Sequence, residues 1–304
     1  MKASIPVRDF FKKFPTDESC LVHLFNIRFG QGHECPKCLN RSKWYRIKAE
    51  RAFSCSSCGH HIHPTVNTPF EDTRTSLQMW FYAIYLFTTS RHGVSGKELQ
   101  RQLGVTYKTA WRIGHQIRKH MAMVDGEAPL SGDCEVDETF VGGRYRGGKL
   151  GGATPNKTIV LGMLQRDGKL MTKIVPNVRK RTLLPIIAQN VAKGSTINTD
   201  AWISYKALPT FGYKHEVVNH DLGEWARGEC NTNAIEGFWR HFKCSISGTH
   251  VHVSKKHMEK YAKEFEYRFN SRSNPLRMFP ELVSSFASLK VGSQVSQSSS
   301  EQPF

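Results

Sequence analysis

The sequence predicts an α/β fold preceded by two smaller modules, and three observations lead to this prediction. Beyond residue 132, short segments of alternating apolar and polar residues are separated by segments with helical periodicity. The first seventy residues contain two Cys-x-x-Cys pairs, and the region that follows them has an all-helical pattern. The C-terminal tail is polar and of low complexity, so we expect it to be disordered. The expected domains are residues 1–70, 71–125 and 126–290, followed by the tail at 291–304.

The chain of 304 residues is strongly basic, with 43 lysines and arginines against 26 acidic residues and a formal net charge of +17. Such a field favours polyanionic partners, because each neutralised phosphate releases condensed counterions. We therefore expect nucleic acid as the partner, ahead of an anionic membrane surface or a role in solubility alone. The most apolar stretch, residues 77–87, is too short to span a bilayer, and no signal peptide is apparent. The expected location is the cytoplasm, in association with the nucleoid, or the nucleus of a eukaryotic host.

The two Cys-x-x-Cys pairs are separated by sixteen residues, a spacing typical of a zinc ribbon. Each pair directs two thiolates at one point, and two pairs complete a closed tetrahedral site. Because all four positions are then filled by protein, we expect a structural Zn²⁺ and not a catalytic one. The predicted ligands are Cys35, Cys38, Cys55 and Cys58. The small hairpin between them is expected to have an aromatic core of Trp44, Tyr45 and Phe53, too little to fold without the metal.

The all-helical region predicts a mostly buried helix over residues 76–90 and then a pair of shorter helices. The first of the pair begins at about Ser95, and the second is capped by Thr106 after a turn at Gly104. The pair resembles a helix-turn-helix, in which the start of the second helix meets DNA base edges. A plain helical hairpin between two domains is the alternative. The residues expected to contact DNA are Tyr107, Lys108, Thr109 and Arg112.

After a linker at 123–132, the predicted elements follow the order strand, strand, strand, helix, strand, short helix, strand, helix. A Gly-rich basic loop (142–157) follows the first strand, and a turn at Asp167-Gly168 joins the second strand to the third. The helix after the third strand must carry Pro185 in its first turn. This order of elements is that of a ribonuclease H-like fold of the retroviral-integrase type.

Three acidic residues occupy positions that such a fold brings together. Asp137 lies on the first strand, Asp200 at the end of the fourth, and Glu236 on the helix after the fifth. Carboxylate oxygens are hard ligands that suit Mg²⁺, with Mn²⁺ as a possible substitute. Two such ions about 3.5–4 Å apart would activate a nucleophile and stabilise the leaving oxygen of an in-line displacement. They would also offset the mutual repulsion of the three carboxylates.

Each of the two strand acids has an alternative interpretation. Glu135 shares a face of the strand with Asp137, so side-chain parity does not separate these two, whereas Glu138 points to the other face. Asp200 could cap the short helix that follows it. Singly these alternatives compete with a metal site. Three acids in three suitable positions of one topology together favour the metal site.

The helix that carries Glu236 offers further polar side chains. Asn233 or Asn231 could supply the third ligand in place of Glu236. Lys243 follows Glu236 by two helical turns and therefore lies on the same face, where it could hold a DNA phosphate. A solvated surface lysine is the alternative for Lys243.

Several motifs together resemble a known family. They are CPKC…CSSC, VDETFVGG, INTDAWISY, NTNAIEGFWRHFK and GTHVHVSKKHMEKYAKEFEYRFNSR. The most specific are IEGFW followed by lysine and the pattern YxxEFxYRxN. The motifs are similar to those of zinc-ribbon-bearing insertion-sequence transposases of the DDE superfamily, the ISXO2-like group related to Merlin-type DNA transposons. The resemblance covers about residues 17–285.

The resemblance implies that Asp137, Asp200 and Glu236 form a metal-binding catalytic triad followed by the basic residue Lys243. Some members carry asparagine at the third position. It further implies a transposase that binds the terminal inverted repeats of double-stranded DNA, cleaves at the element's ends and joins the 3′-hydroxyls to target DNA. Paired ends imply a homodimer or a higher oligomer, without a membrane partner. A nuclease or resolvase that cuts without joining, and a non-enzymatic DNA-binding regulator, are the alternatives.

Overall fold

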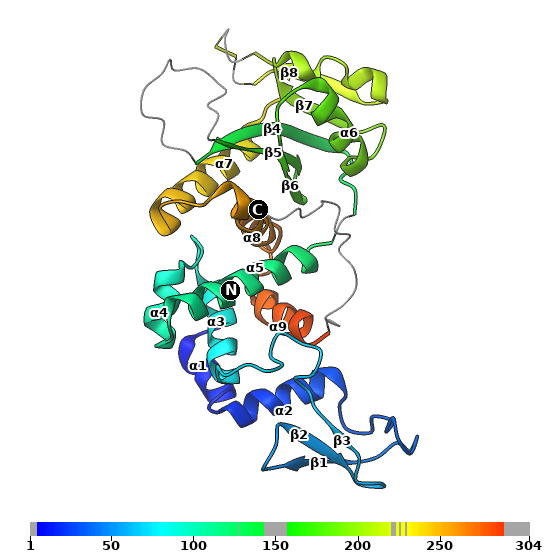
Figure 1. Cartoon of the computed structure of the whole chain (residues 1–304). Helices are drawn as coiled ribbons and strands as arrows, with labels where there is room; N and C mark the ends of the chain where they lie inside the picture. Colours follow the sequence, from blue (N-terminus) through cyan, green and yellow to red (C-terminus); the bar gives the residue numbers. More distant parts are fainter. Residues whose placement is uncertain are drawn as a thin grey trace, which may run out of the picture. The chain divides into compact units, whose positions relative to one another are not determined.

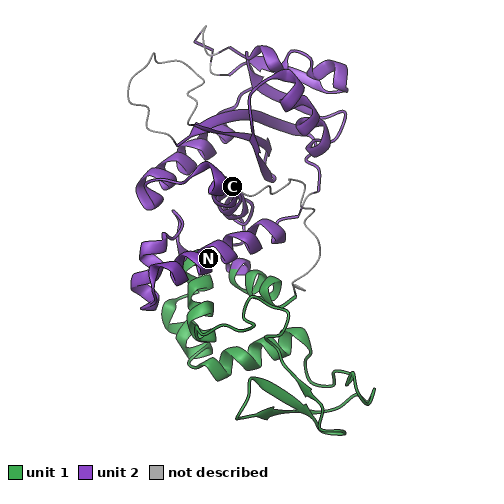
Figure 2. Cartoon of the chain, in the orientation of Figure 1, with its two compact units in different colours: residues 1–88, 279–304 green, residues 89–278 purple. Residues whose placement is uncertain are grey.

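The computed structural model describes residues 5–126, 128–142, 157–219, 223–224, 226–228 and 230–288. Most of the Gly-rich basic loop and all of the tail expected to be disordered lie outside these residues. The chain divides into two compact units, residues 1–88 with 279–304 and residues 89–278 (Figure 2). Within the described ranges, no helix combines the length and the apolarity that a membrane crossing requires.

The first unit is built from helices and a small sheet. Helix α2 starts with a capping box in which Thr16 and Ser19 satisfy each other's backbone N–H groups. Aromatic rings fill the core of the unit, and the rings of Phe70 and Phe286 stack with their centroids 5.3 Å apart. The predicted helix after residue 76 is confirmed as α3, which buries seven side chains. The helices are α1 (Val7–Lys13), α2 (Asp17–Arg28), α3 (Leu77–Thr89) and α9 (Met278–Ser288).

The small sheet has three antiparallel strands in the order β1 (Trp44–Ile47), β2 (Ala52–Cys55) and β3 (His61–Ile62). Trp44 and Phe53 are buried as predicted, and the Phe53 ring stacks on Phe25 of α2 at 4.0 Å. The prediction that Tyr45 belongs to this core is wrong, because Tyr45 is 60% exposed. Successive side chains of a strand point to opposite faces, so burial of Trp44 turns its neighbour toward solvent.

The second unit begins with the predicted helix pair, α4 (Gly96–Leu103) and α5 (Tyr107–Val124). The Ser95 side chain caps α4 by accepting from the Glu98 N–H, and Thr106 caps α5 by accepting from the Thr109 N–H. Gly104 lies between them with φ +64°, a left-handed conformation that ends a helix at little cost only for glycine. The apolar side chains that α4 and α5 bury include Leu99, Leu103, Ala110, Ile113 and Ile117. The sequence signals at both helix starts are confirmed.

The rest of this unit is a five-stranded mixed sheet with helices on both faces (Figure 1). Its spatial order is β6-β5-β4-β7-β8, in which β4, β5 and β6 pair antiparallel while β7 and β8 run parallel to β4. The strands are β4 (Asp133–Val141), β5 (Thr158–Gln165), β6 (Leu170–Val175), β7 (Thr196–Asp200) and β8 (Lys214–Val218). The helices are α6 (Lys180–Asn190), α7 (Asn233–Ser245) and α8 (Lys255–Asn270).

Each face of the sheet has its own apolar core. Leu161 and Met163 of β5 face the core that contains α6, whereas Val160 and Leu164 of the same strand face the core that contains α7 and α8. This alternation follows from the two-residue period of a strand. The sheet is therefore covered on both sides.

The segment after β7 departs from the prediction. Instead of one short helix it forms two 3₁₀ turns, η1 (Ile203–Tyr205) and η2 (Leu208–Phe211). The expectation that Pro185 lies in the first turn of α6 is also wrong, because the helix begins at Lys180 and places the proline in its second turn. Asn177 accounts for the early start: its side chain accepts from the Arg179 N–H and the Thr182 hydroxyl.

Candidate active site and zinc centre

The four predicted zinc ligands converge in the first unit. Every pair among their sulfur atoms lies within 4.8 Å, and two pairs are 3.6 and 3.9 Å apart. A tetrahedron with Zn–S bonds of 2.3 Å has edges of about 3.8 Å, so these spacings fit one zinc ion. The Ser42 hydroxyl is the largest influence on Cys55, and it helps to lower the pKa of that thiol to about 6, which favours the ligating thiolate. The four residues are Cys35, Cys38, Cys55 and Cys58.

The predicted acids Asp137 and Asp200 lie on neighbouring parallel strands. In the β4–β7 ladder Glu135 pairs with Asn198, and continuing this register by two residues brings Asp137 level with Asp200. Asp200 is the last residue of β7, and its Oδ1 accepts from the Trp202 backbone N–H at 3.1 Å. It therefore forms a local turn in addition to facing the site. The alternative expectation that Asp200 caps a helix is wrong, because the N-cap residue of η1 is Trp202 and no side chain caps it.

Electrostatics link all three predicted acids. Burial raises the pKa of Asp137 to about 7, with contributions from the negative charges of Glu138, Asp200 and Glu236. Glu138 accepts a hydrogen bond from the Tyr205 hydroxyl, and burial and Asp200 raise its pKa as well. These acids therefore form one interacting group beside the point where β7 ends next to the central strand β4. A cation beside Asp137 would favour its ionised form.

The three acids are less tightly clustered than the four cysteines. Among the described residues, the four cysteines are the one group of three or more His, Cys, Asp or Glu side chains whose ligand atoms all lie within 4.8 Å of one another. The carboxylates of Asp137, Asp200 and Glu236 thus interact at longer range. Their donor set is nevertheless all carboxylate oxygen, the chemistry that fits Mg²⁺.

The contacts of Glu135 show that its role differs from that of Asp137. It is 1% exposed, its Oε1 accepts from Arg166 Nε at 3.1 Å, and its Oε2 accepts from the Ile235 backbone N–H at 2.9 Å. Ile235 lies in the first turn of α7, where a carboxylate is favoured by the helix dipole. Glu135 therefore holds the first turn of α7 against β4. The contact is made at Ile235, the residue that precedes Glu236.

Helix α7 also approaches the sheet unusually closely. Gly162 of β5 pairs with Asp137, and a Cβ at Gly162 would lie 2.5 Å from the Trp239 ring and 2.9 Å from Ile235. Glycine is thus required where the helix crosses the strand.

The Thr232 hydroxyl, just before the helix, donates to Glu236 Oε1 at 2.8 Å and so orients that carboxylate.

The other predicted polar side chains of this region lie on or near the same helix. Asn233 is exposed at its first position, and Asn231 is half-buried just before the helix starts. Lys243 is exposed and lies in the last turn, two turns after Glu236. The third ligand and the role of Lys243 thus remain predictions.

The start of α5 presents the side chains predicted to meet DNA. Tyr107, Lys108 and Arg112 are exposed, and Thr109 is half-buried because it bonds the capping Thr106. The sequence analysis missed Trp111, which is 37% exposed and whose ring lies tilted against that of His115 with the centroids 3.8 Å apart. A tryptophan within an amphipathic helix resembles a core residue, so only its position one step off the buried face could have revealed it.

Comparisons with known proteins agree on one family. The ISXO2-like transposase domain matches residues 129–270, and the transposase zinc-ribbon domain matches residues 15–61. An uncharacterized protein in transposable element ISH50 of Halobacterium salinarum is 24% identical over 278 residues, which cover 84% of this chain and 92% of that protein. An uncharacterized transposase-like protein of Haemophilus influenzae is 38% identical over 103 residues, which cover 34% of this chain and 82% of that protein. No solved structure matches the chain.

Proposed function

The chain belongs to the ISXO2-like transposase family, and on this premise we propose that it cleaves DNA at the ends of its element and joins the 3′-ends to target DNA. The observation that carries the proposal is the group of carboxylates where β7 ends beside the parallel strand β4. Asp137, Asp200 and Glu236 come from separate elements, and their charges act on one another. The strand order β6-β5-β4-β7-β8 supports a ribonuclease H-like fold for this domain.

The proposed reaction is hydrolysis of one phosphodiester and then transfer of the freed 3′-hydroxyl to a second one. Mg²⁺ held by these three carboxylates would lower the pKa of the attacking water and would offset charge on the reacting phosphate. Asp137, Asp200 and Glu236 are the proposed ligands, and Thr232 orients Glu236. Lys243 is proposed to hold a phosphate beside the site.

The proposed DNA-binding surfaces are the zinc ribbon and the helix pair α4–α5. The four cysteines are the proposed ligands of a structural Zn²⁺. Exposed residues at the start of α5 suit a recognition helix in the major groove, and the net charge of +17 suits a polyanion. Two element ends must be held together for paired joining, so we propose at least a dimer on DNA. Action on nucleoid DNA, or on nuclear DNA in a eukaryotic host, is part of the proposal.

The test uses the single variants Asp137→Asn and Asp200→Asn. Each should reduce Mg²⁺-dependent nicking at the element's ends to background, while binding of the same DNA stays measurable. Asp167→Asn is a matched control, because it makes the same chemical change in the exposed β5–β6 turn. Retained cleavage by either site variant would refute the assigned active site.

A second assay separates the proposal from its rivals. Labelled, pre-cleaved ends are incubated with a supercoiled plasmid, and covalent joining is scored. A nuclease or resolvase would cut without joining. A DNA-binding regulator would bind without any metal-dependent cleavage.

A further inference from the structure

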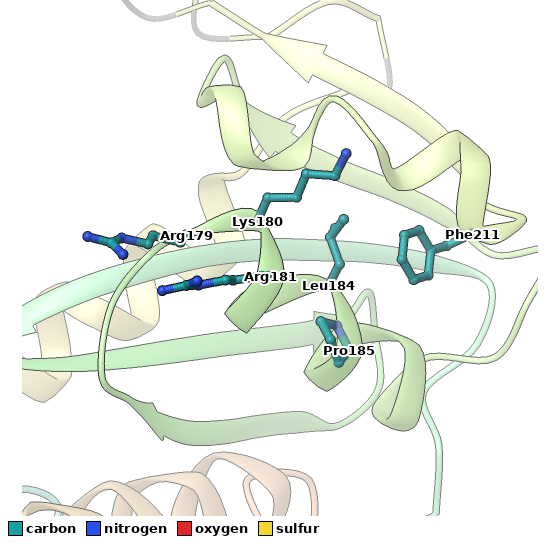
Figure 3. Close-up of a pocket in the computed structure, with 6 residues that line it drawn as sticks. All are labelled: Arg179, Lys180, Arg181, Leu184, Pro185 and Phe211. Atoms are coloured by element: carbon teal, nitrogen blue, oxygen red, sulfur yellow. The ribbon is translucent and has the colours of Figure 1, made fainter.

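A pocket of about 610 Å³ lies at the start of α6, away from the carboxylates themselves. Its lining is basic on one side and apolar on the other. Figure 3 shows Arg179 and Arg181 extending side by side in one direction, while Lys180 extends toward the η1–η2 segment. The lining residues are Arg179, Lys180, Arg181, Leu184, Pro185 and Phe211.

The positive charges of Arg179, Lys180 and Arg181 are unfavourable at the N-terminus of α6, where these residues lie. The N-terminus of a helix carries partial positive charge, so acidic residues are favoured there and cations are not. Here Arg179 is the N-cap residue, Lys180 and Arg181 are the first two residues of α6, and the first turn contains no acid. All three side chains are exposed, and none forms an ion pair with a carboxylate of the described residues. Such an arrangement suits a bound anion.

The pocket lies at the same end of the sheet as the acids. The Ser204 hydroxyl in η1 donates to the Val178 carbonyl just before the pocket residues, at 2.7 Å. Turn η1 starts three residues after Asp200, and its Tyr205 donates to Glu138 beside Asp137. This short path joins the pocket to Glu138, whose side chain points to the α6 face of β4, whereas Asp137 next to it points to the α7 face.

The chemistry of the lining indicates the kind of anion. A guanidinium group can pair with two oxygens of one phosphate, and an ammonium group adds a point charge. Phe211 forms the far wall and is 38% exposed, so it offers a face on which a sugar or a base can pack. A chain of phosphates with attached bases uses both walls, whereas a free phosphate uses only the basic one.

We propose that this pocket binds backbone phosphates of the DNA strand that flanks the phosphodiester being cleaved. The proposal rests on the proposed function, because it places the scissile phosphate at the carboxylates. Arg179 and Arg181 contact the phosphate oxygens, and Phe211 packs on the adjoining nucleotide. These contacts hold the strand in register with the acids and carry no sequence information.

The test compares two double variants that each remove two positive charges. Arg179→Gln with Arg181→Gln alters the pocket. Lys193→Gln with Lys214→Gln alters two exposed lysines where β7 and β8 begin, at the other end of these strands. Binding is measured by fluorescence anisotropy between 50 and 200 mM salt with two probes. One probe is a duplex of the element's end with its flanking DNA, and the other is a duplex of unrelated sequence and equal length.

The pocket variant should make the slope of log K against log salt shallower by roughly 2 for both probes, because each lost phosphate contact contributes about 0.9. The control variant should leave the slope within about half a unit of the wild type. The pocket variant should also unfold at the same temperature or a higher one, since it removes cations from a helix N-terminus. An unchanged slope, an equal change in the control, or a lower unfolding temperature each overturns the proposal.

Cleavage assays keep this proposal distinct from the proposed function. At saturating DNA, the pocket variant should nick the element's end at least tenfold more slowly and with less uniform cut positions, whereas the control nicks normally. A wild-type protein that binds DNA without nicking it would refute the proposed function. The salt dependence of binding would still test whether the pocket contacts phosphates. Normal nicking at uniform positions by the pocket variant would overturn the pocket's role and leave the proposed function standing.

Discussion

Two groups of buried acids in the second unit have opposite electrostatic surroundings. Glu264 of α8 is fully buried, and its carboxylate accepts from Arg118 Nε and from Arg268 Nη2, each at 2.7 Å. Burial alone would raise the pKa of Glu264, but the charges of Arg118 and Arg268 hold it below its ordinary value. Asp137 is also shielded from water, yet carboxylates surround it and its pKa rises to about 7.

The difference separates a structural acid from one suited to bind a cation. The remaining donors around Glu264 are also satisfied, because Arg118 donates to the Val94 carbonyl at 2.9 Å and Arg268 to the Ser90 carbonyl at 2.5 Å. This network joins α5 to α8, and both carboxylate oxygens of Glu264 are engaged by arginines, so it has no excess negative charge to bind a cation. The group around Asp137 has excess negative charge instead, as a binding site for metal ions requires.

Breaking the closed network should have the largest effect on stability. Glu264→Gln removes the charge that compensates two buried arginines, and loss of one partner of a buried ion pair costs about 3–5 kcal/mol. Chemical denaturation should show a loss of this size in the free energy of unfolding of the second unit. Glu98→Gln is the control, since its partner Arg101 is 73% exposed and such pairs contribute little. A loss below about 1 kcal/mol for Glu264→Gln would contradict a structural role.

The second prediction concerns the close approach of α7 to the sheet. Gly162→Ala places a methyl group within 3 Å of Trp239 and Ile235, so the helix must move away from β5. Overpacking of this kind costs roughly 1–3 kcal/mol. Because Glu236 moves with α7, metal-dependent cleavage should fall by more than this loss of stability explains. Gly168→Ala is the comparison, since its closest neighbour is the flexible side chain of Gln165.

The order of elements in the second unit could be predicted because its signals are local. Caps at Ser95 and Thr106 and the Asp167-Gly168 turn each lie within a few residues of the element they define. The four cysteines were equally predictable, because ligand spacing in the chain reflects the geometry of the metal. Helices α1 and α2 were missed because their residues were assigned to the zinc ribbon, and α9 was missed within the α/β domain expected over residues 126–290.

Roles that depend on distant partners could not be predicted. Strand parity places Glu135 and Asp137 on one face, and only the contacts from Arg166 and Ile235, which are 31 and 100 residues away from Glu135, show that Glu135 fastens α7. The motif YxxEFxYRxN likewise gave no hint that Glu264 pairs with Arg118, 146 residues earlier. Long-range pairing of this kind is set by the fold and leaves no periodic trace in the sequence.

The third prediction is that removing an acid raises the free energy of unfolding, whereas in the first prediction removing an acid lowers it. A carboxyl group whose pKa is raised in the folded state binds more protons folded than unfolded, so its burial is tolerated at low pH and becomes destabilising as pH rises toward 7. Asp137→Asn should therefore stabilise the second unit at pH 8 in Mg²⁺-free buffer, by roughly 1–3 kcal/mol. The gain should vanish near pH 4. Glu264→Gln should show the opposite trend, being most harmful at neutral pH and less so in acid, because the pKa of Glu264 is lowered on folding.

The smallest expected effect tests whether Glu236 is held in place by its neighbour. Thr232→Val keeps the shape of a side chain that is 2% exposed but removes the hydroxyl that donates to Glu236 Oε1. The loss of stability should be about 0.5–1.5 kcal/mol, the usual net value of one hydrogen bond.

Thr172→Val is its matched control, because the Thr172 hydroxyl donates to the buried Glu266 in the same unit, on β6, two strands away from Asp137. Both variants should lose similar stability, but only Thr232→Val should weaken Mg²⁺ dependence, seen as a higher Mg²⁺ concentration for half-maximal nicking. Equal Mg²⁺ requirements in the two variants would show that Thr232 supports the fold without orienting Glu236. The third ligand would then be sought at Asn233, which is exposed one helical turn before Glu236.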